Sequence, residues 1–474
     1  MTKLPIAVIG AGPVGLAAAA HLASRQLPFV VLEGGSGAGA AIREWGHVRT
    51  FSPWRYMIDR AAGALLASTG WRAPNPEGLP LGKDLIGGYL APLAQHGAIA
   101  PHLRLNARVV SVGRKDFDKV RTRGRDQQPF EIRLLSGETV TARAVIDASG
   151  TWSRPNPAGS GGVFAAGERD QLDRISYGIP DVTGVQHGRF AGRRVLVVGS
   201  GHSAFNVILD LLKLAGDNPQ TRITWAMRRE TLDTVWGGGA ADALEARGAL
   251  GQRVKRAYEA GRIRIVTPYR IRAIAAAGEG LRVSGAVHEQ VVDIEIDELV
   301  VATGFRPDLD MLSEVRLGLD PWLECASALG PLIDPNEHSC GTVRPHGARE
   351  LAHPEKDFYI VGMKSYGRAP TFLLATGYEQ VRSVAAMLAG DVAAAERVEL
   401  ELPETGVCST DGAAGGCCES PAITPVTIAT RAAPLLAVAA PSSCCGGPAP
   451  QGVEACCVQD ADAKAAGEPG CGCS

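Results

Sequence analysis

The chain contains 474 residues, of which 45% are hydrophobic, and carries a formal net charge of −2. Such a length predicts two or three domains instead of one compact core. The near-neutral charge argues against a nucleic-acid partner or an anionic membrane surface, and no apolar span is long enough to cross a bilayer. Glycines and a proline interrupt the apolar stretch at residues 4–20, and no cleavage pattern follows it. We therefore expect a cytoplasmic protein that begins with a strand, a loop and a helix.

The first predicted elements surround a glycine-rich dinucleotide loop. An apolar run at residues 6–9 predicts a strand, and an alanine-rich pattern predicts the helix that follows. The loop between them contains Gly10, Gly12, Pro13 and Gly15. Its first glycine permits a tight turn, its second lets the backbone approach a pyrophosphate, and its third lets the helix pack closely on the strand.

The next strand is predicted at residues 29–32. It leads into Glu33, where a carboxylate would hydrogen-bond the 2'-hydroxyl of a ribose. Further along, the strand-rich stretches 103–112 and 130–140 predict a small β-ribbon. The first loop and its acid therefore predict a site for a dinucleotide with an unphosphorylated ribose.

A second glycine-rich loop contains Gly199, Gly201 and Ser203, with Ala204 as a tolerated substitute for the third glycine. It follows an apolar run at residues 195–198 and leads into a leucine-rich helical pattern. Two such loops in matching contexts predict that the chain binds two dinucleotides.

The strand after the second loop ends without an acid. Residues 223–229 finish in Arg228 and Arg229. The forked guanidinium group of arginine suits a phosphate dianion, which a carboxylate would repel. The second site is therefore expected to prefer NADPH.

Two further segments, 144–150 and 298–304, each read as a strand that ends in a small-residue turn. Together with the two loops they resemble the two-dinucleotide-binding flavoproteins, which carry FAD on the first domain and NAD(P)H on the second. Within that superfamily, residues 150–157 look like the linker of flavin-containing monooxygenases. The rest of the monooxygenase signature is present only as fragments within residues 187–192.

The resemblance implies an α/β fold with two Rossmann-like, doubly wound domains, the second inserted in the first. FAD and NADPH are the implied cofactors. The implied boundaries are 1–155 and 301–402 for the two parts of the FAD-binding domain, 156–300 for the NAD(P)H-binding domain and 403–474 for a disordered cysteine-rich tail. Besides the loop residues, the implied cofactor-binding residues are Arg43, Trp45, Val109, Gly150, Thr303, Gly362 and Thr376.

Residues 43–54 lie where members of the superfamily approach the flavin ring, so they could form a wall that excludes water. Alternatively, Trp45 and Trp54 are packing residues and His47 is a loop histidine with satisfied hydrogen bonds. Residues 371–381 read as the start of a helix. This helix could present amides to the flavin pyrimidine, form part of the core, or do both.

The chain departs from the disulfide reductases of this superfamily. Those enzymes need a redox pair beside the flavin, usually Cys-x-x-Cys, but this spacing is absent here and residues 1–324 contain no cysteine. They also end their last FAD strand in Gly-Asp, whereas Met363 follows Gly362 here. The resemblance implies that NADPH reduces FAD and that a flavin hydroperoxide, formed with molecular oxygen, oxygenates a soft nucleophile. No catalytic side chain is expected.

The tail at residues 403–474 is poor in aromatic residues, yet it holds nine of the chain's eleven cysteines. Such a composition cannot bury enough apolar surface to fold alone. Paired thiolates on a flexible chain bind soft ions, whereas zinc would favour the absent Cys-x2-Cys spacing. The expected metal ligands are Cys417, Cys418, Cys444, Cys445, Cys456, Cys457, Cys471 and Cys473.

These vicinal cysteines are similar to those of arsenic metallochaperones, and the chain looks like the flavin-dependent monooxygenases of arsenic resistance operons. The resemblance implies a detoxifying enzyme that oxidises trivalent arsenicals or antimonite. Other readings remain open: N- or S-oxygenation of a small organic substrate, an NAD(P)H oxidase or reductase, or a flavoprotein whose tail only buffers metal. Cys340 is either a substrate thiol or an inert buried cysteine. A homodimer is compatible with the sequence.

Overall fold

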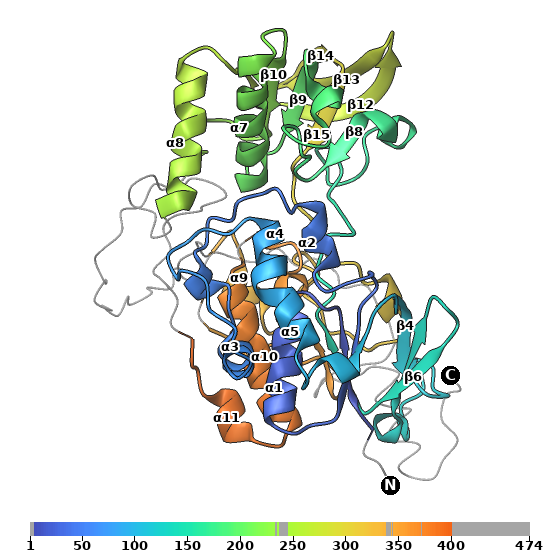
Figure 1. Ribbon diagram of the computed structural model, residues 1–474. Helices are drawn as coiled ribbons and strands as arrows, with labels where there is room; N and C mark the ends of the chain where they lie inside the picture. Colours follow the sequence, from blue (N-terminus) through green and yellow to red (C-terminus); the bar gives the residue numbers. More distant parts are fainter. Residues whose placement is uncertain are drawn as a thin grey trace, which may run out of the picture. The chain divides into compact units, whose positions relative to one another are not determined.

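The computed structural model describes residues 4–232, 235–236, 245–337, 343, 345–370 and 372–400. One arrangement of five parallel strands is present twice, in the orders β16-β7-β1-β2-β3 and β8-β15-β9-β10-β11. Figure 1 labels β8, β9, β10 and β15 of the second sheet. The first sheet consists of β1 (Ile6–Ile9), β2 (Phe29–Leu32), β3 (Leu103–Arg104), β7 (Ala144–Asp147) and β16 (Phe358–Ile360). The second consists of β8 (Ile175–Tyr177), β9 (Arg194–Val198), β10 (Arg222–Ala226), β11 (Arg264–Val266) and β15 (Glu298–Val301).

Each parallel sheet is covered on both faces, which is why the central strand β1 is apolar and buried at every position. In β1, Ile6 and Val8 pack into a core with the helices, whereas Ala7 and Ile9 face a small antiparallel sheet. That small sheet consists of β4 (Val109–Arg114), β5 (Phe130–Leu134) and β6 (Thr139–Ala142). A corresponding small sheet packs on the second parallel sheet and consists of β12 (Arg270–Ala277), β13 (Gly280–Val287) and β14 (Gln290–Ile296).

The predicted β-ribbon is confirmed for β4, β5 and β6, but the prediction was wrong at its start. Leu103 and Arg104 form β3, which pairs with Val31 and Leu32 at the edge of the first parallel sheet. A two-residue strand carries no periodicity of its own. Its place is set by the free edge of β2, which the local sequence does not show.

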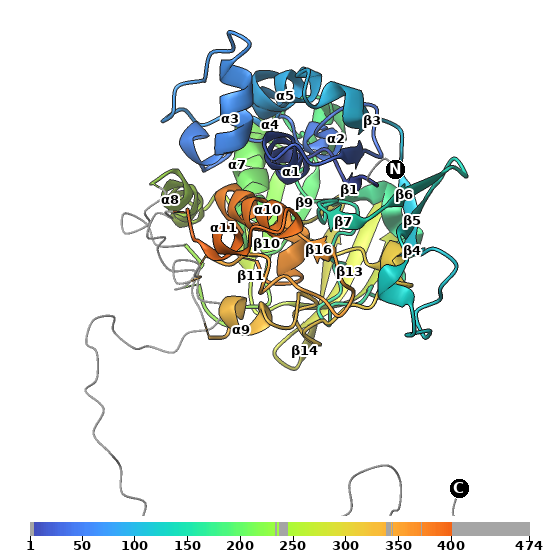
Figure 2. The same ribbon diagram turned by 90° about the horizontal axis from the view of Figure 1, so that it is seen from below.

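The helices that lead away from the two loops are α1 (Pro13–Ser24) and α7 (His202–Asp217). α10 (Leu374–Leu388) lies beside α1 (Figure 2), so the helix expected within residues 371–381 is confirmed and begins at Leu374. The remaining helices are α2 (Ala40–Glu44), α3 (Arg60–Ala67), α4 (Gly82–Leu85), α5 (Ala91–Gln95), α6 (His187–Phe190), α8 (Glu245–Glu259), α9 (Gly330–Ile333) and α11 (Val392–Glu396).

The chain leaves the first sheet after β7 and returns to it as β16, with the whole second sheet in between. The outgoing and returning segments run together: the Asn156 amide donates to the Gly304 carbonyl at 2.9 Å, and the Arg306 amide donates to the Arg154 carbonyl at 3.0 Å. The predicted fold class, with two Rossmann-like units and the second inserted in the first, is therefore confirmed. The predicted tail at 403–474 lies outside the described residues.

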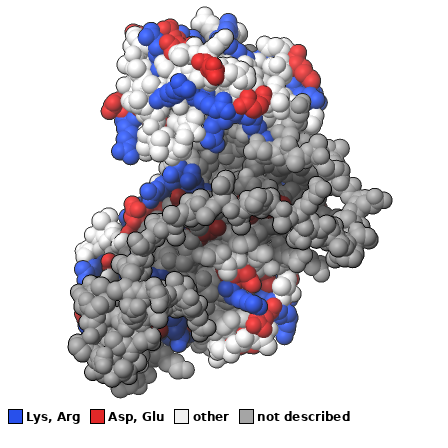
Figure 3. All heavy atoms as spheres, turned by 180° about the vertical axis from the view of Figure 1, so that it is seen from behind, with Lys and Arg blue, Asp and Glu red and all other residues white. Residues whose placement is uncertain are grey.

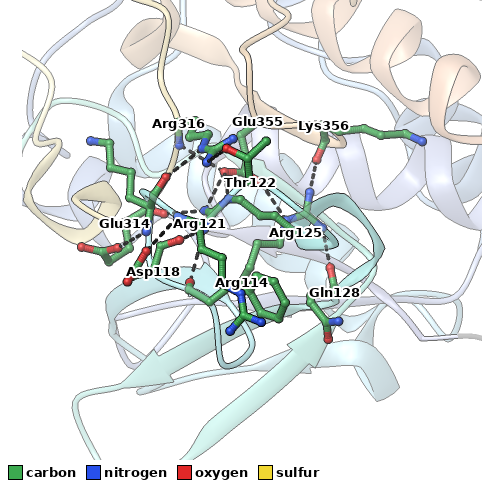
Figure 4. A network of polar contacts seen from close by, with 12 residues as sticks. Arg114, Asp118, Arg121, Thr122, Arg125, Gln128, Glu314, Arg316, Glu355 and Lys356 are labelled. Atoms are coloured by element: carbon green, nitrogen blue, oxygen red, sulfur yellow. Dashed lines mark hydrogen bonds and ion pairs between the residues drawn. The ribbon is translucent and has the colours of Figure 1, made fainter. Parts of the chain in front are cut away.

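A buried ionic cluster fastens the first small sheet to the returning chain (Figure 4). Glu355 accepts hydrogen bonds from Arg114 Nε at 2.8 Å and from Arg125 Nη2 at 2.8 Å, and all three side chains are at most 2% exposed. Burial alone would raise the pKa of Glu355, but its hydrogen bonds with Arg125 and Arg114 hold the pKa below the usual value. The carboxylate is therefore charged in the folded state at neutral pH.

Replacing this carboxylate leaves two buried guanidinium groups without their counter-charge. We expect Glu355→Gln to lower the free energy of unfolding by about 3–5 kcal/mol, measured by urea denaturation at pH 7. The exposed pair of Glu131 with Arg133 is the control, because Glu131→Gln should change stability by about 1 kcal/mol or less. Since the folded pKa of Glu355 is depressed, the difference between wild type and Glu355→Gln should shrink as pH falls below about 4.5. Equal effects of the two substitutions would contradict this account.

None of the helices in the described part of the chain combines the length and apolarity that crossing a bilayer requires. On the face drawn in Figure 3, lysine and arginine side chains are interspersed with aspartate and glutamate. This face therefore carries charge of both signs.

Candidate functional site

The first glycine-rich loop lies at the carboxyl end of β1, against the turn after β7. A Cβ atom on Gly10, whose φ is +97°, would lie 2.8 Å from the carbonyl oxygen of Ala148. A Cβ atom on Gly15 would lie 2.0 Å from the carbonyl oxygen of Gly10, so this glycine allows α1 to pack on the loop. Gly12 differs, because a Cβ atom there would meet no atom within 4 Å. Pro13 begins α1 at a position where no amide donor is lost.

Gly12 is also not needed for backbone conformation. Its φ of −75° and ψ of −175° are open to any residue. The absence of a side chain therefore serves neither packing nor backbone geometry here. What it leaves is open space at the N-terminus of α1, where the helix offers unpaired amides and the positive end of its dipole to an anion.

Glu33 connects the end of β2 to this loop. Its Oε2 accepts a hydrogen bond from the Ala11 amide at 2.7 Å, and its Oε1 accepts one from the Gly35 amide at 2.7 Å. Each carboxylate oxygen keeps a further lone pair, so a ribose hydroxyl can still donate to it. The two amides fix the carboxylate in place before any ligand arrives.

The start of α10 and the end of β16 meet the start of α1. A Cβ atom on Gly377 would lie 2.7 Å from Val14 Cγ2, and one on Gly362 would lie 3.2 Å from the same atom. Thr376 is buried in the first turn of α10. The predicted residues Gly362 and Thr376 are therefore brought together beside the first loop, although more than 340 positions separate them from it.

Two other predicted residues lie at the rim of this region. Gly150 has a φ of +73°, and a Cβ atom there would meet nothing within 4 Å. Val109 is half-buried at the start of β4. It follows Arg108, whose Cα lies 3.6 Å from the position of a Cβ atom on Gly34, immediately after Glu33.

The segment at residues 43–54 makes contacts with parts of both units. The ring of Phe51 lies 5.1 Å from that of His202, the first residue of α7. Trp152 donates from Nε1 to Glu44 at 2.7 Å, lies 6.5 Å from Trp45 and stacks on Phe305 at 4.6 Å. The sequence did not single out Trp152 or Phe305 as partners, because 153 positions separate them.

The residues of this segment differ in how deeply they are buried. Trp54 is 7% exposed within the main core, so it is a packing residue. Arg43 is exposed, and Trp45 is half-buried against Gly82. The buried Nε2 of His47 has no hydrogen-bond partner among the described residues, which speaks against the alternative of a histidine with satisfied hydrogen bonds.

The second loop repeats the geometry of the first. A Cβ atom on Gly199, whose φ is +128°, would lie 2.3 Å from the carbonyl oxygen of Ala302, whereas one on Gly201 would meet nothing within 4 Å. Ser203 lies in the first turn of α7. The Thr303 hydroxyl donates to the Asn156 carbonyl at 3.1 Å, so this predicted residue is bound to the linker.

Arg229 lies directly at the second loop. Its Nε donates to the Ser200 hydroxyl at 3.3 Å, and Thr267 donates to its carbonyl. Arg228 is exposed, and its Nη1 donates to the Ser160 carbonyl at 2.8 Å. Of the two predicted arginines, Arg229 is therefore hydrogen-bonded to the loop, whereas Arg228 is hydrogen-bonded to Ser160.

A buried ion pair that was not predicted from the sequence lies at the first loop. Lys364 Nζ lies 2.7 Å from Asp147 Oδ2 and 3.1 Å from Ser149 Oγ. Asp147 is 0% and Lys364 is 1% exposed. The available signal was a charged residue at the end of β7, Asp147, and a lysine in the turn that follows β16, the neighbouring strand in the sheet.

Cysteine is scarce in the described part of the chain. Cys325 is its only cysteine, and burial, together with the nearby Asp320, raises the thiol pKa to about 12. Within the described ranges, no group of three or more His, Cys, Asp or Glu side chains is placed to hold a metal ion. The eight predicted metal ligands of the tail, from Cys417 to Cys473, and Cys340 lie outside the described residues.

The curated proteins that resemble this chain are oxidoreductases by name. A ferredoxin–NADP reductase of Thermus thermophilus is 26% identical over 346 residues, 71% of this chain and 84% of that protein. The indole-3-pyruvate monooxygenase YUCCA1 of Oryza sativa is 34% identical over 219 residues, 45% of this chain and 46% of that protein.

Solved structures and a family model complete the comparison. The bacillithiol disulfide reductase of Bacillus cereus, at 18% identity and a TM-score of 0.60, covers 82% of this chain and 99% of its own. The cadaverine monooxygenase DfoA of Erwinia amylovora, at 15% identity and a TM-score of 0.59, covers 87% and 100%. At these identities the two structures show the fold alone. The model described as pyridine nucleotide-disulphide oxidoreductase matches residues 4–324. The expectation of an enzyme is thus confirmed, and the chain belongs to the pyridine nucleotide-disulphide oxidoreductase family.

Proposed function

We propose that the protein is an NADPH-dependent flavin monooxygenase, with FAD bound at the first sheet and NADPH at the second. The observation that carries the two cofactor sites of this proposal is the open space beside Gly12 and Gly201. In each loop the preceding glycine is needed for packing or turn geometry, whereas the middle glycine only leaves room for a ligand. The proposed boundaries are 1–155 and 301–402 for the FAD-binding domain and 156–300 for the NAD(P)H-binding domain.

The residues of the first site fit FAD. The N-terminus of α1 would hold the pyrophosphate, Glu33 would accept from the adenosine ribose, and the N-terminus of α10 would face the flavin. When bound, FAD would accept a hydride from NADPH and pass the electrons to oxygen. One oxygen atom would then enter the substrate, while the other would leave as water with two protons.

The proposed substrate is a soft nucleophile with a lone pair, namely trivalent arsenic or antimony. Disulfide exchange is disfavoured in the described part of the chain, because its single thiol is buried and has a pKa of about 12. The vicinal cysteines of the tail supply soft ligands for such an ion. Delivery by these thiols would raise the local concentration of substrate without taking part in the oxidation.

Turnover by the full-length protein tests the substrate. NADPH oxidation and oxygen consumption should rise on adding arsenite, methylarsenite or antimonite, with one pentavalent product for each NADPH. A variant in which the eight predicted metal-binding cysteines of the tail are changed to serine should keep its KM for NADPH. Its KM for the metalloid should rise by about ten-fold or more, the scale of losing one strong contact. If none of the three compounds stimulates oxidation, the substrate proposal is withdrawn. An organic amine or sulfide that does stimulate it would then favour N- or S-oxygenation.

A second candidate is transfer of electrons from NADPH to a small iron–sulfur protein. It is favoured by the relative named ferredoxin–NADP reductase, which matches 71% of this chain. Anaerobic reduction of a ferredoxin by NADPH and this protein, faster than any metalloid-stimulated oxygen consumption, would support it. Stoichiometric hydrogen peroxide that no added substrate changes would instead indicate an oxidase.

A further inference from the structure

Ser149 is an exposed residue whose hydroxyl is held by a buried ion pair. Its hydroxyl donates to Asp147 Oδ1 at 2.6 Å and accepts from Lys364 Nζ at 3.1 Å. Lys364 completes the cluster by donating to Asp147 Oδ2 at 2.7 Å. The Ser149 amide also donates to Asp147 Oδ1, at 3.0 Å, which fixes the backbone of the turn.

The chemistry of the two charged groups decides what the hydroxyl can do. An ammonium group only donates hydrogen bonds and a carboxylate only accepts them. The single proton of the Ser149 hydroxyl is therefore committed to Asp147, and one of its two lone pairs is committed to Lys364. The lone pair that remains makes Ser149 an acceptor toward the solvent side and prevents it from donating to a phosphate oxygen.

The position of Ser149 places this acceptor at the first dinucleotide site. A Cβ atom on Gly10 would lie 3.1 Å from the Ser149 Cα, so the turn touches the glycine-rich loop. Val361, just before the turn that carries Lys364, donates its amide to the Asp147 carbonyl at 2.9 Å. Three segments, 10–15, 147–150 and 361–364, thus meet at the carboxyl edge of the first sheet.

We propose that Asp147 and Lys364 orient Ser149 as a hydrogen-bond acceptor for a sugar-chain hydroxyl of FAD. The inference rests on the proposed function, since it needs FAD at the first sheet. Hydroxyl groups are the donors that the ribityl and ribose parts of FAD offer, whereas its pyrophosphate offers only acceptors. Ser149 is thus a binding residue, and Asp147 and Lys364 are positioning residues that act through it.

The ion pair of Asp147 and Lys364 suits this role because its two side chains cannot move apart into water. Both charges are buried, so neither can exchange its partner for water, and breaking the pair would leave an uncompensated charge. A serine hydroxyl at the surface would normally rotate between donor and acceptor states. Here the donor state is removed, which favours a hydroxyl ligand over an anionic one.

A thermodynamic cycle that combines the Ser149→Ala substitution with removal of single hydroxyl groups from the ligand tests the proposal. Wild type and Ser149→Ala would be reconstituted with FAD and with FAD analogues that each lack one ribityl or ribose hydroxyl, and Kd would be measured by flavin fluorescence. Ser149→Ala should bind FAD about ten-fold more weakly, the size of one hydrogen bond. For one analogue, Kd should be about ten-fold higher than for FAD in wild type, whereas in Ser149→Ala the analogue and FAD should have the same Kd. If the ratio of Kd for each analogue to Kd for FAD is the same in both proteins, the inference is wrong.

A second variant separates the positioning role from a structural one. Changing Lys364→Met together with Asp147→Leu replaces the pair by apolar side chains and should preserve Tm, because no buried charge is left alone. Ser149 would then rotate freely, and the preference for FAD over the critical analogue should fall by about ten-fold. An unchanged preference in a folded double variant would overturn the positioning role. Wild-type protein that binds no FAD at all would instead remove the proposed function.

Discussion

Gly12→Val is expected to yield a folded protein that purifies without flavin colour. The space into which the valine would project contains no protein atom within 4 Å of a Cβ, and the backbone of Gly12 has dihedral angles that valine accepts. The fold therefore tolerates the side chain. The pyrophosphate of FAD needs the same space, so Kd for FAD should rise by at least about 100-fold, equivalent to about 2.7 kcal/mol.

Gly201→Val is the matched control for this result. It makes the same change in the second loop, where a Cβ atom again meets nothing within 4 Å. This variant should stay yellow and lose NADPH binding, whereas Gly12→Val should keep NADP⁺ binding as measured by calorimetry. The assignment of the two cofactors would be reversed if Gly201→Val were the colourless protein. Loss of both cofactors in either variant, with a lowered Tm, would show that these glycines serve the fold.

Arg229→Ala is expected to change which coenzyme the enzyme prefers. Arg229 Nε lies 3.3 Å from the Ser200 hydroxyl in the second loop, and its charge suits the 2'-phosphate that distinguishes NADPH from NADH. The KM for NADPH should rise by about 100-fold, the scale of a charge-assisted contact, while the KM for NADH changes by less than about three-fold. Steady-state kinetics with each coenzyme measure the two KM values and hence their ratio.

Arg228→Ala provides the comparison for this prediction. The Arg228 guanidinium donates to the carbonyl of Ser160, a residue outside the loop, at 2.8 Å. Arg228→Ala should therefore raise the KM for NADPH less than Arg229→Ala does. An equal loss of affinity for NADPH and NADH in Arg229→Ala would contradict a role in reading the phosphate. It would indicate that Arg229 supports the loop through Ser200 instead.

The parts of the fold that the sequence predicted are those that local rules determine. Each dinucleotide loop is continuous in sequence, so the roles of Gly10, Gly12 and Gly15 follow from turn geometry and helix packing. The carboxylate at Glu33 follows in the same way from the length of one strand–helix–strand unit. Such features depend on a few neighbouring residues and are visible without tertiary structure.

What the sequence did not predict depends on pairing between distant segments. Asp147 and Lys364 are 217 positions apart and meet only because β7 and β16 are neighbours in the first sheet. Glu355 and Arg114 are 241 positions apart and meet because a small sheet covers one face of the first parallel sheet. In both cases an isolated charge in the sequence looks like an ordinary surface residue, and only the fold supplies its partner.

The proposed function depends on the reduction of FAD at the first sheet by NADPH at the second. The most direct test is to mix the purified yellow protein with one equivalent of NADPH under anaerobic conditions. The visible absorption of the bound flavin is then recorded over time. We expect this absorption to bleach and to return when oxygen is admitted. Bound flavin that stays oxidised in excess NADPH would contradict the account.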